Sequence, residues 1–427
     1  MPIALLVLVL LIGASPAILL IDGPGVYGGV AATVAAAVVI LVQSIRAGQA
    51  DYLIIQLRSA AFVILVPAVW MFIQILPLGP IGLSNTIWET AQQALGRPII
   101  GSISIDTGAT LISLFRYLSM ASLLFVASAI AIDRERAAWL LFALLGATVV
   151  ITLMVMAADV GVFTFKDRTT SDYALATAAV GAIVSATAAT RAFERLEIRG
   201  WAVNSSSAAP VAGCLAALLL CLMIIILDGD AIRMFGVAYG LAALGAVVVI
   251  RHFGLGLWGR SAMTAAALTL GSLIAYAVLA KHGDDLTLIA ASHASTSLIA
   301  TTRRILADLN WTGIGAGTFA DLLPIYGDAD GLIDVTAPTA AAAVTIELGR
   351  PMFWAIAIAV IFGIFAFLHA ALRRGRDSFY PAAGAGCLVT MFILSFGDVG
   401  LFGTTPSILA SAVLGLAFAQ TRSRSVR

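Results

Sequence analysis

Charged residues are scarce in this sequence, at 11% of 427 positions, against roughly 25% in an average soluble domain. Hydrophobic residues make up 61%, and the mean hydropathy is +1.04. This imbalance excludes an ordinary soluble protein and predicts an all-α, polytopic integral membrane protein that forms a single membrane domain over 1–427. The net charge of +1 argues against nucleic acid as a partner.

Cysteine and histidine are also rare, with three and four residues. Cys214, Cys221 and Cys387 all lie within apolar runs, so none is placed in an outer loop where a disulfide would form. The chain has no H-E-x-x-H motif, and the glycine run 313–317 lacks the Lys-Ser/Thr ending of a phosphate-binding loop. We therefore expect no metal and no cofactor, and interpret the glycine run as a flexible turn. Two Asp-x-Asp pairs that resemble a metal-binding transferase signature are interpreted as acidic turns: Asp228/Asp230 and Asp328/Asp330.

Twelve apolar runs are long enough to cross a hydrocarbon core about 30 Å thick. They cover 3–20, 25–45, 59–77, 111–131, 138–157, 173–190, 208–227, 234–250, 261–280, 352–371, 380–397 and 402–420. The run 173–190 is the weakest, because alanine dominates it. No basic residue precedes Arg46, so the first run lacks the charged start of a signal peptide and is expected to be retained.

Basic residues indicate how the spans are oriented. With a cytoplasmic N-terminus, the predicted inner segments hold 15 of the 24 basic residues and the outer segments hold eight. Because basic residues near span ends are retained inside, this distribution favours twelve spans with both termini cytoplasmic. Arg116 lies inside the fourth run near its outer end, where it either reaches the outer headgroups or has a functional role.

Two outer segments are long, 78–110 and 281–350, and long loops in compact proteins are usually functional or disordered. The first contains an amphipathic stretch that predicts a short interfacial helix. In the second, apolar residues recur on one face between 298 and 309, which predicts a helix with Arg304 on the opposite face. Arg304 then either forms a solvated pair with Asp308 or holds a phosphate or pyrophosphate in its guanidinium fork.

Four features resemble the O-antigen ligase and polymerase superfamily of bacterial envelope glycosyltransferases. The first is a many-span layout with one large outer loop late in the chain. The second is the string that runs from Arg303 or Arg304 through LADLNWTGIGAGTFADLLPIY. The third is APTAAAAVTIELGRP (Ala337–Pro351), where the family has a polar turn and then an E-x-G segment, although a TAPT stretch replaces the His-Asn pair common there. The fourth, NTIWETAQQALGRPIIGSISID, is similar to a subgroup associated with exopolysaccharide production.

The resemblance implies a metal-independent inverting glycosyltransferase of GT-C-like architecture on the outer face of the bacterial inner (cytoplasmic) membrane, with the loop 281–350 in the periplasm. The donor would be an undecaprenyl-diphosphate-linked glycan. The acceptor would be a second lipid-linked unit for a polysaccharide polymerase, which the subgroup resemblance favours, or a lipid A core for an O-antigen ligase. Cations would bind the diphosphate: Arg303, Arg304, Arg116 and Arg350. A base would deprotonate the acceptor hydroxyl: His293, Glu347 or Asp321.

Two other functions stay open. A transporter or flippase of a lipid-linked glycan would also use a cationic cavity, but it should show Gly/Pro-broken span pairs or ionisable residues at mid-membrane, and neither is evident. A non-catalytic component of polysaccharide assembly would tolerate loss of Arg304. The expected partners are the lipid bilayer, the undecaprenyl-diphosphate-linked glycan and other polysaccharide assembly proteins.

Arg304→Ala should abolish glycan assembly and leave membrane insertion intact, because it removes the cation on the polar face of the loop helix just before the glycine run. Polymer in cells that carry the variant would be measured relative to the amount of protein in the membrane. Wild-type polymer from a normally expressed variant would remove Arg304 from the mechanism.

Overall fold

The structure is a computed structural model, and it describes residues 2–21, 23–44, 47–79, 82–162, 164–198, 205–252, 286–288, 291, 294–327, 336–374 and 377–421. Within these ranges the secondary structure is entirely helical, without a β-strand. The all-α prediction is therefore confirmed for the described part of the chain.

Seven helices in the described ranges are long and apolar enough to cross a membrane. They are α3 (Pro24–Ser44), α6 (Thr107–Ile130), α7 (Arg134–Asp159), α8 (Arg168–Ile198), α9 (Ser205–Asp228), α10 (Ala231–His252) and α15 (Arg350–Arg373). A bent pair, α1 (Pro2–Gly13) and α2 (Ser15–Ile21), makes an eighth if its two halves, inclined by 46°, form one span. The chain is a polytopic helical membrane protein, as predicted.

Three further apolar helices are shorter. They are α16 (Phe379–Leu394), α17 (Thr404–Ala419) and the stretch Ala60–Ile75 of α4 (Ala47–Ile75). Together, these helices account for all of the predicted runs except 261–280, which lies outside the described residues. Seven spans are supported by length and composition, and the count of twelve stays a prediction.

The weakest predicted span, 173–190, lies in α8. This helix is at the centre of the described bundle. In its most apolar window 89% of the residues are buried, compared with 17–44% in the other six long helices. It packs against α7, α9, α10, α16 and α17. Small side chains such as Ala176, Ala179 and Ala182, all 0% exposed, let these neighbours approach closely. Its low hydropathy follows from this position, because a helix enclosed by protein needs no large lipid-facing side chains.

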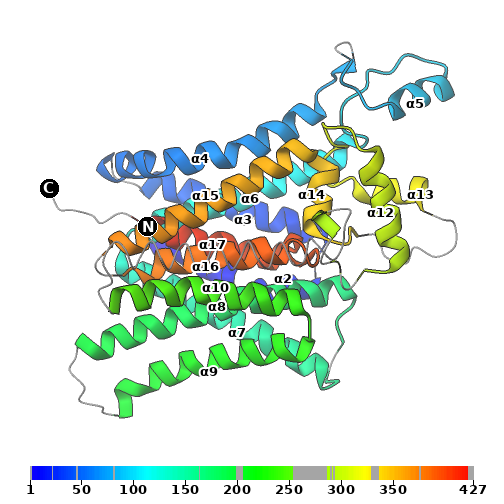
Figure 1. Ribbon diagram of the computed structural model, residues 1–427. Coiled ribbons are helices and arrows are strands. Elements are labelled where there is room, and N and C mark those ends of the chain that lie inside the picture. The colour runs from blue at the N-terminus through cyan, green and yellow to red at the C-terminus, as the bar shows by residue number, and fades with distance from the viewer. Residues whose placement is uncertain are drawn as a thin grey trace.

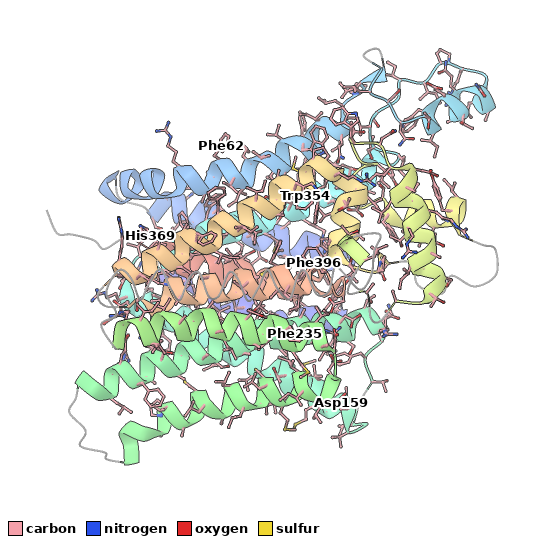
Figure 2. The ribbon with its side chains drawn as sticks, in the orientation of Figure 1. Phe62, Asp159, Phe235, Trp354, His369 and Phe396 are labelled. Carbon is pink, nitrogen blue, oxygen red and sulfur yellow. The ribbon has the colours of Figure 1, made fainter. Side chains whose placement is uncertain are left out.

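The spanning helices lie side by side and run between two ends of the molecule (Figure 1). The start of α1 and the end of α17 lie at one end, called the terminal end, and α5, α12, α13 and α14 lie at the other, called the loop end (Figure 1). Asp159 at the end of α7 lies toward the loop end and His369 in α15 toward the terminal end (Figure 2). Phe62, which is 72% exposed, points away from the bundle on the free side of α4, as expected of a lipid-facing residue (Figure 2).

Short helices build the loop end. They are α5 (Ile87–Leu95), η2 (Leu286–Leu288), α12 (Thr296–Asp308), α13 (Phe319–Tyr326), α14 (Ala340–Leu348) and η3 (Gly400–Phe402). The predicted interfacial helix corresponds to α5, which has no buried residue. The predicted loop helix corresponds to α12, whose start is capped by the Ser295 hydroxyl and which buries Leu298, Ile305 and Leu306. Both segments are confirmed as helices, while their place on the outer face and at the membrane interface stays a prediction.

Cysteine labelling should place the two ends on opposite sides of the membrane. The native thiols Cys214, Cys221 and Cys387 are buried and should not react, so the wild-type protein is a silent background. An impermeant maleimide added to intact cells should label Ala300→Cys at the loop end. It should label Arg373→Cys at the terminal end only after the membrane is opened. Equal labelling of both variants in intact cells would contradict this topology.

Candidate functional site

The glycine run 313–317 is a hydrogen-bonded segment, buried over 313–316, rather than the flexible turn that its composition suggests. The Ile314 N–H donates to the Ile346 carbonyl, and the Gly315 N–H donates to the Glu347 carbonyl. On the other side, the Ile105 N–H donates to the Ile314 carbonyl. The run is therefore held between the segment before α6 and the last turn of α14.

The glycines of this run are required by both conformation and space. Gly313, Gly315 and Gly317 have φ values of 76°, 110° and 79°, in the region that side chains rarely adopt. A Cβ atom on Gly315 would collide with the Ser104 side chain, and one on Gly317 would collide with the Ser113 hydroxyl. The glycines thus allow the loop backbone to lie directly against the start of α6.

Two polar side chains of α4 fix the junction between α14 and α15. Gln74 is fully buried, and its Nε2 donates to the carbonyls of Thr312 (3.0 Å) and Glu347 (2.8 Å). The Trp70 Nε1 donates to the Leu348 carbonyl at 2.8 Å. The sequence offered one signal for this role, a lone amide near the end of an apolar run.

Glu347, on the last turn of α14, places its partly buried carboxyl against the start of α13. Its Oε1 accepts from the Phe319 N–H at 3.4 Å, and the Gly317 N–H is a second backbone donor. Burial raises the pKa of Glu347 to about 7, although these two N–H groups and Arg116 each lower it. A carboxyl with this pKa can both accept and release a proton near neutral pH.

Arg116, inside the fourth predicted run, lies at the same site. Its Nη2 donates to the Phe402 carbonyl at 2.8 Å, and its guanidinium lies 4.1 Å from the centre of the Tyr27 ring. It is also close enough to lower the pKa of Glu347 by its charge. The structure therefore brings two of the sequence candidates, Glu347 and Arg116, together. Arg116 is bound by protein groups and does not only extend toward the lipid headgroups.

Asp321 lies at the edge of this site, exposed on the first turn of α13. Partial burial and the neighbouring Asp106 carboxylate raise the pKa of Asp321. Asp106 caps α6 by accepting from the N–H groups of Gly108 and Ala109 at 2.7 and 3.1 Å. Three acids, Asp106, Asp321 and Glu347, thus surround the glycine run.

The other candidate arginines lie on α12 or contact it. Arg303 and Arg304 are exposed, and the Arg304 Nη1 is 3.5 Å from the Tyr326 carbonyl at the far end of α13. Arg350 donates from Nη2 to the Leu306 carbonyl at 2.9 Å. Because α13 has 8 residues, it separates Tyr326 from the Glu347 end by about 12 Å. His293 lies outside the described residues.

A buried ion network at the loop end was not foreseen from the sequence. Arg233 is 1% exposed and binds four carboxylates. The partners and distances are Asp172 (2.6 Å), Asp228 (2.7 Å), Asp398 (2.8 Å) and Asp230 (3.6 Å). The pair Asp228/Asp230 therefore holds an arginine, whereas Asp328/Asp330 lies outside the described residues. No group of described His, Cys, Asp or Glu side chains has the arrangement to hold a metal ion.

This network supports both sides of the Glu347–Arg116 site. The Asp398 carbonyl accepts from the Ala340 N–H at 2.9 Å and so fixes the start of α14, the helix that carries Glu347. The Asp398 carboxylate also accepts from the Gly400 N–H at 2.6 Å, which fixes η3, the short helix that ends at Phe402. Asp398 thus connects the network to the backbone on which both site residues depend.

No model of a known protein family matches this chain, and no curated protein sequence matches it. The function is accordingly argued from the residues and geometry of the site.

Gly315→Ala should destabilise the protein by at least about 2 kcal/mol, because it combines a strained φ with a collision against Ser104. Gly96→Ala is the matched control, since Gly96 also has a positive φ but has open space around it and should cost only about 1 kcal/mol. Thermal unfolding in detergent would compare the two variants. Equal stability of both would mean that the glycine run tolerates a side chain.

Proposed function

We propose that the protein is a membrane glycosyltransferase that polymerises an undecaprenyl-diphosphate-linked glycan on the outer face of the bacterial inner membrane. The observation that carries the proposal is the Glu347–Arg116 site: a carboxyl whose pKa is raised to about 7 lies beside a fixed guanidinium at the loop end. A general base and a cation are what glycosyl transfer from a diphosphate donor requires.

The proposed reaction is a single displacement. The acceptor hydroxyl oxygen bonds to the anomeric carbon of the donor sugar while the bond from that carbon to the diphosphate oxygen breaks. The hydroxyl proton moves to the Glu347 carboxylate, and the electron pair leaves with the diphosphate. With its pKa near 7, Glu347 is about half deprotonated at neutral pH and can serve as the base. The chemistry needs no redox partner and no resident metal.

The cations have different roles in this proposal. Arg116 stabilises the charge that develops on the departing diphosphate, because it is the arginine close enough to act on Glu347. Arg303 and Arg304, exposed on α12, bind the diphosphate or glycan as it arrives, and Arg350 fixes α12 through the Leu306 carbonyl. Asp321, at the edge of the site, hydrogen bonds to the acceptor sugar.

The membrane topology is part of the proposal: twelve spans, GT-C-like architecture, a periplasmic loop end and cytoplasmic termini. Two observations support it. The split of the 24 basic residues favours this orientation. Also, α10 begins near the loop end, where Phe235 lies, and so runs toward the terminal end, whereas η2 contacts α14 at the loop end. The predicted span 261–280 lies between these two elements and outside the described residues.

Glu347→Gln should block polymer formation, because the amide cannot accept the hydroxyl proton. Undecaprenyl-diphosphate-linked glycans would be profiled by mass in cells whose only copy carries the variant, with outer-face and inner-face pools separated. Single repeat units should accumulate on the outer face, as in cells without the protein. Glu89→Gln, on the exposed helix α5, is the matched control and should give normal polymer. Normal polymer from Glu347→Gln would exclude Glu347 as the base.

The same profile distinguishes the alternative functions. Long unligated chains on the outer face would identify an O-antigen ligase rather than a polymerase. Accumulation on the inner face alone would identify a flippase, and the transferase proposal would fall. A component that only assists assembly would show no dependence on Glu347 or Arg116.

The pH dependence of the purified enzyme should follow the Glu347 carboxyl. Its pKa is raised from 4.5 to about 7, so activity should rise with pH up to about 7 and fall about tenfold for each unit below it. Arg116→Met removes a charge that lowers this pKa, so the profile should shift to higher pH in addition to the loss of rate. A pH profile that is flat between 5 and 8, or identical in the two proteins, would contradict the assignment.

A further inference from the structure

A polar cavity lies at the terminal end, whereas Glu347 lies at the loop end. Its volume is about 140 Å³, many times the roughly 15 Å³ that one water needs. Arg134 from the start of α7 and Arg191 and Arg195 from the end of α8 line it, and so do Phe379 and Tyr380 from the first turn of α16. Three arginines around one small cavity are unusual in a chain with 11% charged residues.

Arg191 is buried in this cavity with part of its guanidinium unsatisfied. The residue is only 6% exposed, and its Nη1 has no hydrogen-bond acceptor among the described residues. The Arg191 Cζ lies over the Phe142 ring, 5.3 Å from its centre, a cation–π contact. A buried N–H donor without an acceptor is energetically unfavourable, so this nitrogen points to a ligand that supplies one.

The acids around the cavity are largely neutralised by other arginines. Asp377 forms an ion pair with Arg134 at 3.0 Å, and Glu194 forms one with Arg251 at 3.6 Å. Glu135 is the remaining acid, and it is exposed at the rim. Arg191 and Arg195 have no carboxylate within ion-pair distance in the described ranges. The lining holds three arginines and three acids, and Arg251, which pairs with Glu194, adds a fourth cation, so the group has a net charge of one positive unit.

The first turn of α16 adds to this preference. This 16-residue helix begins at Phe379, and Ser378 before it makes no side-chain cap bond to the helix. The Ser378 hydroxyl instead accepts a hydrogen bond from Arg251. The Tyr380 N–H donates to the Asp377 carbonyl and Pro381 has no N–H, so what this helix start offers an anion is chiefly the partial positive charge of the helix dipole.

We propose that this cavity binds a phosphate group. A tetrahedral oxyanion would satisfy the free Nη1 of Arg191, interact with Arg195 and lie at the start of α16. The phosphate could belong to the headgroup of an anionic phospholipid, because the cavity lies where the apolar part of α8 ends, at the level expected for headgroups. It could equally be free phosphate from solution. This site is separate from the proposed transferase site and does not depend on it.

Purified, delipidated full-length protein in neutral detergent would test the proposal. In one arm, thermal unfolding is followed while sodium phosphate replaces sodium chloride at constant ionic strength. In the other, native mass spectrometry measures retention of phosphatidylglycerol against phosphatidylethanolamine. Arg195 is exposed, so the Arg195→Gln variant should fold normally. Arg191→Lys keeps the positive charge but loses the forked guanidinium that can donate two hydrogen bonds to one phosphate. Each should weaken binding about tenfold, whereas Arg373→Gln, an exposed arginine at the same end, should leave it unchanged.

Stabilisation by phosphate that is lost in Arg195→Gln would identify a soluble phosphate ligand. Selective retention of phosphatidylglycerol that is lost in the same variant would identify a lipid headgroup. Binding in neither arm, or equal binding by wild type, Arg195→Gln and Arg373→Gln, would overturn the proposal and leave a cavity filled with water. Glu135→Gln tests whether the ligand is negatively charged, because removal of this acid at the rim should tighten the binding of a phosphate.

Discussion

The buried Arg233 network is the interaction on which the loop end depends. One guanidinium joins α8, the turn between α9 and α10, and the turn after α16, through carboxylates that are 14%, 17%, 2% and 5% exposed. Loss of one partner from a buried charge pair typically costs about 3–5 kcal/mol, because the remaining charge is left in a medium of low polarity. Here four carboxylates would lose their shared cation. The turns that carry Asp398 and Phe402 therefore depend on Arg233 for their position, and the Glu347–Arg116 site depends on these turns.

Helices could be predicted from the sequence because run length and apolar periodicity are local properties. Glu347 and Arg116 could be chosen as candidates for the same reason, one from a short motif and the other from a charge inside an apolar run. Their proximity could not be derived, because it depends on contacts between remote segments. Gln74 bonds to a carbonyl 238 residues away, and Arg233 bonds to a carboxylate 165 residues away. A single sequence contains no information on which of its isolated polar residues meet.

The glycine run shows how composition can suggest the opposite of the structure. Three glycines within five residues indicate backbone freedom when they are read alone. In the fold, the same lack of side chains lets the run lie between α6 and α14 with its N–H and C=O groups paired to both neighbours. The absence of side chains gives this segment conformational freedom in the unfolded chain and allows close backbone contact in the native state. This contact places the two backbone N–H groups that donate to Glu347.

The alanine-rich helix α8 has a mechanical consequence. Alanine has no side-chain rotamers, so the buried alanines of α8 lose no side-chain entropy on burial and have no alternative arrangement through which strain could relax. Asp172 in the Arg233 network and Arg191 in the terminal cavity lie on this helix 19 residues apart, or about 28 Å. α8 is thus a rigid helix with the charged residue Asp172 toward one end and Arg191 toward the other. A displacement of one end of α8 along the helix axis would displace the other end by the same distance.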